Sequence, residues 1–178
     1  MSDAPPKSRK GYLKVTEIFH SLQGEALQSG LPTVFVRLTG CPLRCTYCDS
    51  EYAFYGGEWM HFDAIIEEIQ KYDTPWVCVT GGEPLAQKRC AELLARLCDE
   101  GFRVSLETSG ALDIARVDPR VCRVMDLKTP GSGELERNRM EDEALSEVRR
   151  KGYLGRHEYF ETLDSNVAGD EPHLVLLG

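Results

Sequence analysis

Three cysteines crowd into one short segment of this chain. Cys41, Cys45 and Cys48 are separated by three and by two intervening residues. The chain has seven cysteines, an odd number, and such a tight group is more typical of a metal site than of a disulfide framework. An electron-transfer iron–sulfur cluster is normally held by four cysteines. Three thiolates on one loop could therefore hold a cube of iron and sulfide and leave one iron open to chelate a cofactor.

Zinc is the alternative occupant of this cysteine group. Structural zinc usually takes four ligands in two closely spaced pairs, and no second pair follows Cys48 at a suitable distance. His61 could be a fourth ligand, but it is expected to open a helix. A zinc or electron-transfer protein without catalysis stays open at this point.

The remaining cysteines stand apart from this group. Cys78 lies in the apolar run WVCVT, and Cys90 and Cys98 fall eight residues apart on one face of a helical pattern. Because a free cysteine behaves as a small hydrophobe, we expect these three and Cys122 to be buried, inert thiols.

Strand and helix patterns alternate around the cysteine group. Strands are predicted over residues 12–21, 33–40 and 75–80, and two more begin at 102 and 121 and lead into turns. Helices are predicted over 62–72, starting near Asp63, and over 85–101, capped by Gly101, with a short helical link over 113–120. Strands separated by helices of this length imply βαβ units and a parallel sheet with right-handed crossovers.

Polar and glycine-rich segments follow four of these strands directly. They read TGCPLRC, TGGEP, ETSG and DLKTPGSG. The carboxyl ends of parallel strands meet at one edge of a sheet, where ligands bind in such folds. We therefore expect the four segments to converge on an active site.

Composition narrows the class of protein and its partners. The chain has 178 residues, 42% of them hydrophobic and 28% charged, and a formal net charge of −8, which suits one globular domain. An acidic chain has no general attraction to nucleic acid or to an anionic membrane, so neither is expected as a partner. No stretch approaches the roughly 18 apolar residues of a membrane span. The N-terminus is polar and lacks the apolar core of a signal peptide, which favours a cytoplasmic protein.

The domain prediction follows from the same patterns. Residues 1–10 read as a flexible tail and 11–178 as a single domain. After Met140 the pattern degrades: a helix is predicted first, and no strong period returns until the apolar run HLVLL.

The cysteine segment resembles a known loop. GCPLRCTYCDS, with Tyr47 just before the last cysteine, resembles the cluster-binding loop of radical S-adenosylmethionine enzymes, and the turn from Gly81 to Pro84 resembles their GGEP turn. Together with SLQGE, FVRLTGC, CDS, ETSG and DLKTPGSGE, these motifs are similar to the 7-carboxy-7-deazaguanine synthase family of the queuosine precursor pathway. The matching motifs run from about Glu17 to Met140, in the family's order.

The resemblance implies a fold and an activity. The fold would be α/β, a partial parallel (β/α) barrel of the radical SAM type, divergent or shortened at its C-terminal end because residues 141–178 match the family poorly. The enzyme would be a ring-contracting lyase that converts 6-carboxy-5,6,7,8-tetrahydropterin to 7-carboxy-7-deazaguanine with loss of ammonia. It would use a 4Fe–4S cluster, S-adenosylmethionine and Mg²⁺, act as a homodimer, and take electrons from a flavodoxin or ferredoxin. A glycyl-radical activase shares the cysteine spacing and is the alternative radical enzyme.

The resemblance also assigns residues to each ligand. The cluster would be held by Cys41, Cys45 and Cys48, and Mg²⁺ by Ser50, which by itself reads as a turn residue. The pterin would be bound by Leu22, Gln23, Gly24, Glu25, Arg37 and Thr80. The S-adenosylmethionine would be bound by Tyr47, Cys48, Asp49, Gly82, Glu83, Thr108, Ser109, Asp126, Leu127 and Lys128.

Arg37 is the assignment that the residues themselves support best. Alternation in VFVRL puts Arg37 on the same face as Phe35, in the expected barrel mouth. A guanidinium there needs a counter-ion, and its fork matches the two oxygens of a carboxylate. We expect the substrate carboxylate to be that counter-ion.

Overall fold

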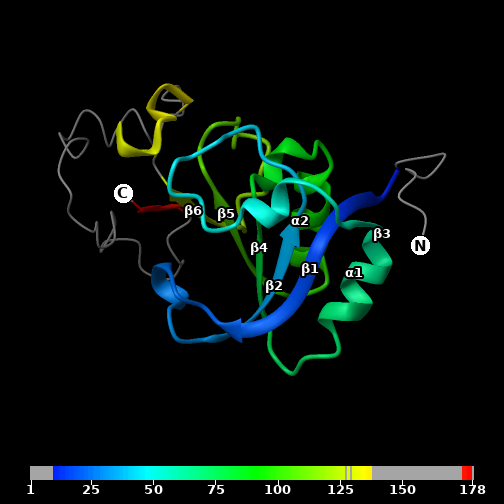
Figure 1. The fold of residues 1–178 in the computed structure, drawn as a ribbon. Coiled ribbons are helices and arrows are strands. Elements are labelled where there is room, and N and C mark those ends of the chain that lie inside the picture. The colour runs from blue at the N-terminus through cyan, green and yellow to red at the C-terminus, as the bar shows by residue number, and fades with distance from the viewer. Residues whose placement is uncertain (1–9, 127, 129, 138–173, 178) are drawn as a thin grey trace.

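The protein is described by a computed structural model that covers residues 10–126, 128, 130–137 and 174–177. Within these residues a seven-stranded sheet has the order β3-β1-β2-β4-β5-β6-β7 (Figure 1). The strands are β1 (Tyr12–Leu22), β2 (Pro32–Leu38), β3 (Glu58–His61), β4 (Trp76–Gly81), β5 (Arg103–Thr108), β6 (Cys122–Asp126) and β7 (Leu174–Leu177). The helices are α1 (Phe62–Ile69) and α2 (Cys90–Asp99). Short 3-10 turns occur at Ala26–Gln28, Glu51–Phe54, Pro84–Ala86, Pro130–Ser132 and Leu135–Arg137.

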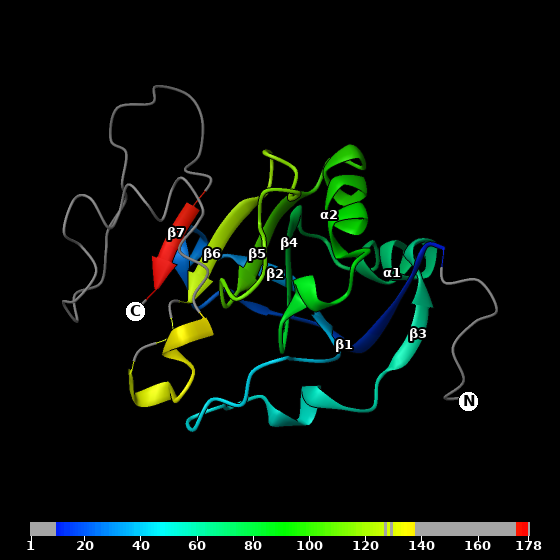
Figure 2. The same cartoon turned by 90° about the horizontal axis from the view of Figure 1, so that it is seen from above.

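The larger part of the sheet is parallel. Strands β2, β4, β5, β6 and β7 pair in parallel and in this order, with β7 beside β6 (Figure 2). This open parallel sheet with helices between its strands confirms the predicted partial barrel. The expectation that all strands are parallel is wrong for β1, which pairs antiparallel with β2 and β3. Residues 23–31 between β1 and β2 are too few for a parallel crossover, which needs about a dozen residues or more.

Strand β3 was not predicted from the sequence. EWMH is too short to show an alternation, and it forms a strand because Tyr12 to Val15 of β1 provides a pairing edge. Its last residue, His61, caps α1 by accepting a hydrogen bond from the Asp63 backbone at 3.3 Å. His61 therefore opens a helix as predicted, and the helix begins at Phe62.

Helix α2 is shorter than predicted. A 3-10 turn and a short link precede it, so it begins at Cys90. Its end is the expected glycine cap: Gly101 has φ +88°, and the Phe102 backbone donates to the Leu97 carbonyl at 3.1 Å. Residues 113–120 form turns instead of a helical link. Asp113 and Asp118 each accept a hydrogen bond from the backbone two residues later, at 2.8 and 2.9 Å, which favours turns over helix.

Both helices pack on one face of the sheet. Alternate residues of the central strands meet the apolar faces of α1 and α2, and this face forms the core. Fully buried members of the core include Val34, Val36, Ile65, Ile69, Val77, Val79, Leu93, Leu94, Leu97 and Leu106. The opposite face of the same strands is left for polar residues and the site described below.

The scattered cysteines are mostly buried, as predicted. Cys78, Cys90 and Cys122 are buried, and burial raises the pKa of the Cys78 and Cys90 thiols well above the ordinary value. Cys98 differs, since it is only partly buried at the edge of the core.

Two sequence predictions lie largely outside the described residues. These are the N-terminal tail at 1–10, of which Lys10 is described, and the helix after Met140. The apolar run HLVLL supplies β7. Among the described residues no helix is long and apolar enough to cross a membrane.

Candidate active site

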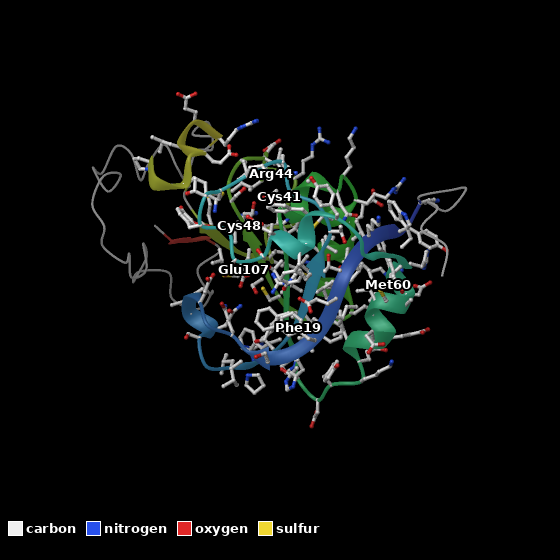
Figure 3. All side chains as sticks on the ribbon, viewed as in Figure 1. Phe19, Cys41, Arg44, Cys48, Met60 and Glu107 are labelled. Atoms are coloured by element: carbon white, nitrogen blue, oxygen red, sulfur yellow. The ribbon has the colours of Figure 1, made fainter. Side chains whose placement is uncertain are left out.

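A cavity of about 560 Å³ opens at the carboxyl ends of the parallel strands. Its walls come from the segments that follow β2, β4, β5 and β6, together with residues 23–25 after β1. The predicted convergence of these segments is therefore confirmed. Figure 3 shows Cys41, Cys48 and Glu107, which all line this cavity, in the same part of the molecule.

Most of the residues predicted for a site line this one cavity. They are Gln23, Gly24, Glu25, Arg37, Cys41, Cys45, Tyr47, Cys48, Asp49, Ser50, Thr80, Gly82, Thr108, Ser109, Asp126 and Lys128. Two do not line it: the Leu22 side chain is 63% exposed to solvent, and Glu83 is fully buried. Leu127 lies outside the described residues.

The cysteine loop carries three free, partly buried thiols. The Cys48 backbone donates to the Cys45 carbonyl at 3.2 Å, and the Leu43 backbone donates to Cys41 Sγ at 3.4 Å. Leu43 itself is buried and anchors the middle of the loop. Burial raises the pKa of the Cys41 and Cys45 thiols, and Lys128 opposes this shift at Cys45. Binding of a metal group must therefore displace protons from these thiols.

The segment after β6 supports the cysteine loop from outside. Figures 1 and 2 both show the yellow segment beside the cyan loop. The Thr46 backbone donates to the Ser132 carbonyl at 3.0 Å, and the Arg44 backbone donates to Glu134 Oε1 at 2.6 Å. The DLKTPGSGE motif therefore holds the loop as well as lining the cavity through Asp126 and Lys128.

Arg44 belongs to the cysteine loop, and no role was predicted for it from the sequence. Its guanidinium donates to the Cys41 carbonyl at 2.9 Å and lies 4.3 Å from the centre of the Phe54 ring. The side chain is exposed and does not line the cavity. Arg44 holds the backbone that carries the thiols. The spacing of the cysteines carries no information about this role, so it could not be predicted from the sequence.

The GGEP turn lies directly against the cysteine loop. The Glu83 backbone donates to the Gly40 carbonyl at 2.9 Å. A Cβ atom on Gly82 would lie 2.6 Å from Cys41 Cβ and 2.7 Å from the Gly40 carbonyl oxygen. Only glycine allows this approach, so the turn is more than an ordinary tight turn.

The side chain of Glu83, a residue predicted for the cofactor site, does not line the cavity. Its carboxylate has no solvent exposure and is hydrogen-bonded to two residues of the cavity wall. It accepts hydrogen bonds from the Leu85 backbone at 3.0 Å, the Ser109 backbone at 2.8 Å and the Thr108 hydroxyl at 3.0 Å. The Glu83 side chain therefore joins the turns after β4 and β5, and its predicted contact with a cofactor through the backbone of the turn stays a prediction.

The opposite wall of the cavity is polar. Gln23 Nε2 donates to Glu107 Oε1 at 3.1 Å, and Gln23 Oε1 accepts from the Glu25 backbone at 3.1 Å. Glu107 was not predicted as a site residue, although it stands at the end of a strand within the quoted ETSG motif. Ala26, next to Glu25, has φ +60°, a conformation that favours glycine. Such strain is typical of turns at functional sites.

Carboxylates gather around Glu25. Partial burial raises its pKa from 4.5 to about 7, and the charges of Glu107, Asp126 and Asp49 act in the same direction. Lys128 forms an ion pair with Asp126 and compensates part of this negative charge. Near neutral pH, Glu25 can therefore both donate and accept a hydrogen bond.

Arg37 has a counter-ion within the protein that was not predicted from the sequence. Its Nε donates to Glu17 Oε1 at 2.8 Å. A bulge in β1 between Val15 and Glu17 puts Glu17 opposite Arg37 in register, on the cavity face. Regular alternation along β1 does not reveal this bulge.

Comparison with known proteins agrees with this geometry. The model of the radical SAM superfamily matches residues 35–126, from β2 to the end of β6. The 7-carboxy-7-deazaguanine synthase of Chlorobaculum tepidum is 47% identical over 131 residues, which cover 74% of this chain and 60% of that protein. That of Thermoplasma acidophilum is 37% identical over 142 residues, covering 79% and 67%. The chain belongs to the 7-carboxy-7-deazaguanine synthase family of radical SAM proteins.

A solved structure of the family has the same fold. The crystal structure of QueE from Escherichia coli matches with a TM-score of 0.62 and 28% identity, covering 79% of this chain and 77% of that one. These matches favour the synthase interpretation over a glycyl-radical activase or a zinc protein. The chain spans 60% of the Chlorobaculum tepidum protein and 55% of the Koribacter versatilis synthase, which is 47% identical over 124 residues.

Family membership implies a 4Fe–4S cluster and S-adenosylmethionine, and the residues present fit both. Three free thiols on one loop form part of the wall of one cavity, and thiolates are the preferred ligands of iron–sulfur clusters. Among the described residues, no three His, Cys, Asp or Glu side chains are grouped closely enough to hold a single metal ion. Gly82 brings the backbone of the GGEP turn against Cys41, and both residues line the cavity in which a cofactor could be held.

Proposed function

We propose that this chain carries the catalytic centre of a 7-carboxy-7-deazaguanine synthase, which converts 6-carboxy-5,6,7,8-tetrahydropterin to 7-carboxy-7-deazaguanine with loss of ammonia. One observation carries the proposal. The cysteine loop and a polar wall of Gln23, Glu25, Arg37 and Glu107 line the same cavity. A reactive group held by the thiols would therefore lie next to a bound polar heterocycle.

The polar wall suits the nitrogen-rich edge of a pterin. In this proposal Glu107 and Gln23 offer acceptor oxygens to ring N–H groups, and their mutual hydrogen bond fixes the orientation of the Gln23 amide. Glu25, with its pKa of about 7, accepts or donates according to the atom it meets. Gly24 and Thr80 complete this wall, and Leu22 contributes its backbone at most, since its side chain turns to solvent.

Arg37 binds the carboxylate of the substrate in this proposal. Its guanidinium lies in the cavity wall, and its side chain is 18% exposed. A charge-assisted hydrogen bond at a site so little exposed to solvent contributes about 1.5–3 kcal/mol to binding.

The cysteine side of the cavity would hold the reactive group. When bound there, a 4Fe–4S cluster with S-adenosylmethionine supplies the carbon radical that removes a hydrogen atom from C6 of the pterin. Cys41, Cys45 and Cys48 would hold the cluster. The cofactor would be bound by Tyr47, Cys48, Asp49, Gly82, Thr108, Ser109, Asp126 and Lys128, which all line the cavity, together with Leu127 and the backbone of Glu83.

Ser50 would supply an oxygen ligand to Mg²⁺. It starts the 3-10 turn at Glu51–Phe54 and lines the cavity, and its side chain does not cap that turn but lies with Oγ 4.0 Å from Cys48 Sγ. Mg²⁺ prefers hard oxygen ligands and takes several of them from water or substrate. The protein therefore needs to supply only one hydroxyl, with a substrate carboxylate and water as the other ligands.

The proposal extends to partners and location. A cluster of this kind must be reduced before it acts, which calls for a low-potential donor such as a flavodoxin or a ferredoxin. We also propose a homodimer, testable by light scattering. A cytoplasmic location suits cysteines that have to stay as free thiols.

The decisive experiment is a product assay. Anaerobically reconstituted protein is incubated with reductant, S-adenosylmethionine, Mg²⁺ and 6-carboxy-5,6,7,8-tetrahydropterin, and the deazaguanine product and ammonia are measured. We expect product only with the complete mixture. Cofactor cleavage that the pterin does not affect, without any deazaguanine, would overturn the proposed substrate.

A further inference from the structure

The β1 bulge moves Glu17 to the cavity face of the sheet. Before the bulge, Leu13 and Val15 point into the core, whereas after it Ile18 is the residue that packs against the core. Phe19 therefore lies on the other face, where its ring stacks on Phe35 at 5.0 Å. Phe35 lines the cavity, so the residues of β1 beyond the bulge support the cavity wall.

Arg37 contacts three residues outside the predicted site, Glu17, Phe19 and Tyr52. Glu17 Oε1 accepts from Arg37 Nε at 2.8 Å and from the Tyr52 hydroxyl at 2.8 Å. The guanidinium carbon lies 5.6 Å from the centre of the Phe19 ring and 5.7 Å from that of Tyr52. Figure 3 shows Phe19 on β1. These contacts fix the plane of the guanidinium as well as its position.

A guanidinium can meet a carboxylate through either of two edges. One edge uses Nε and one terminal nitrogen, and the other uses both terminal nitrogens. Glu17 takes Nε, while the two terminal nitrogens make no hydrogen bond or ion pair with another residue of the described part of the chain. Only the edge with both terminal nitrogens is left for a ligand in the cavity.

We infer that Glu17 is a positioning residue that makes Arg37 select a planar carboxylate on the pterin. Glu17 holds Nε, so Arg37 presents its two terminal nitrogens side by side to the two carboxylate oxygens. This inference rests on the proposed function, because it takes the ligand to be a carboxylated pterin. It assigns a role in substrate specificity to Glu17, a residue of β1 that does not itself line the cavity.

A purely structural ion pair would behave differently. Loss of such a pair weakens the fold and lowers the affinity for every ligand alike. Loss of a positioning contact lowers the affinity for the carboxylated ligand alone. The measurement that separates the two is the ratio of the dissociation constants for pterin and for 6-carboxypterin, which differ only in the carboxylate and are too oxidised to react.

The experiment is calorimetric titration of anaerobically reconstituted protein, with S-adenosylmethionine present, by each of the two pterins. We expect the parent to prefer 6-carboxypterin and Glu17→Ala to lose about tenfold of this preference, equivalent to about 1.4 kcal/mol. Glu17→Gln keeps an oxygen acceptor for Nε and is expected to retain the preference within about threefold. Arg37→Ala should abolish it, and Glu58→Ala, which removes an exposed carboxylate from β3, should not change it.

Three outcomes would decide against the inference. An unchanged ratio in Glu17→Ala, with normal preference in the parent, overturns the positioning role and leaves the proposed function standing. An equal loss of affinity for both pterins shows a structural role and overturns it too. A parent that binds neither pterin overturns the proposed function and this inference with it. Should Glu17→Ala not fold, Glu17→Val, a good strand former, replaces it in the same comparison.

Discussion

Glu83 Oε2 accepts hydrogen bonds from both the backbone and the hydroxyl of Ser109, at 2.8 and 2.5 Å. The two residues belong to turns that follow neighbouring parallel strands, β4 and β5. The fully buried Glu83 carboxylate therefore links two turns. One turn lies against the cysteine loop, and the other carries Thr108 and Ser109 into the cavity wall. Glu83 therefore links two segments whose residues line the cavity.

Removal of the Glu83 carboxylate should destabilise the whole protein. In Glu83→Ala, buried backbone and hydroxyl donors lose their acceptor, and we expect the free energy of unfolding to fall by about 3 kcal/mol or more. Glu83→Gln keeps one acceptor oxygen and should lose less. Urea unfolding measures both. The control is Glu92→Ala, which breaks an exposed ion pair with Arg89 and should cost less than about 1 kcal/mol. Equal losses at positions 83 and 92 would contradict this account.

Loss of one loop thiol should prevent assembly of the cluster. Cys45→Ala leaves two thiolates on the loop, so after anaerobic reconstitution we expect loss of the brown colour and of most of the about four irons per parent chain. Cys98→Ala is the matched control, because Cys98 lies partly buried at the edge of the core and outside the cavity wall. Iron content that is equal in Cys45→Ala and in the parent would remove the basis of the proposed chemistry.

Glu25 should make stability depend on pH. Its pKa is raised from 4.5 to about 7, so between these values the folded state binds more protons than the unfolded state. The free energy of unfolding then falls as pH rises through this window. Glu25→Gln cannot ionise, so it should gain stability relative to the parent between about pH 5 and about pH 8 in urea unfolding. Parallel pH profiles for the two proteins would argue against a raised pKa.

Substitutions at Ser50 test the magnesium ligand. Ser50→Thr keeps a hydroxyl and should keep Mg²⁺-stimulated turnover, whereas Ser50→Ala and Ser50→Cys should lose it, since a hard cation gains little from sulfur. Uncoupled cleavage of S-adenosylmethionine should survive in all three variants. Iron content is measured in parallel, because Ser50 Oγ lies 4.0 Å from Cys48 Sγ and a substitution could disturb the loop. Ser50→Ala with full iron and undiminished Mg²⁺ stimulation would make this serine a turn residue only.

Features that depend on residues close together in the sequence could be predicted from the sequence. The cysteine spacing, the glycine cap after α2 and the position of polar turns after strands can all be read from residues a few positions apart. The convergence of those turns also followed, because parallel strands bring their carboxyl ends to one edge. Where a local signal was ambiguous, as at residues 113–120, side-chain hydrogen bonds from Asp113 and Asp118 favoured turns over a helix.

By itself, the sequence determined the loop that can hold a cluster, the strands that deliver it and the family to which the chain belongs. Only the tertiary structure decided that Arg37 pairs with Glu17, that the buried Glu83 bonds Ser109, and that Gln23 meets Glu107, 84 residues away. The physical reason is that these contacts depend on strand register and direction. One bulge in β1 changes which side chains face the cavity, and a linker of residues 23–31 makes β1 antiparallel. Neither the bulge nor the pairing partner of a strand is written in the local pattern of hydrophobic and polar residues.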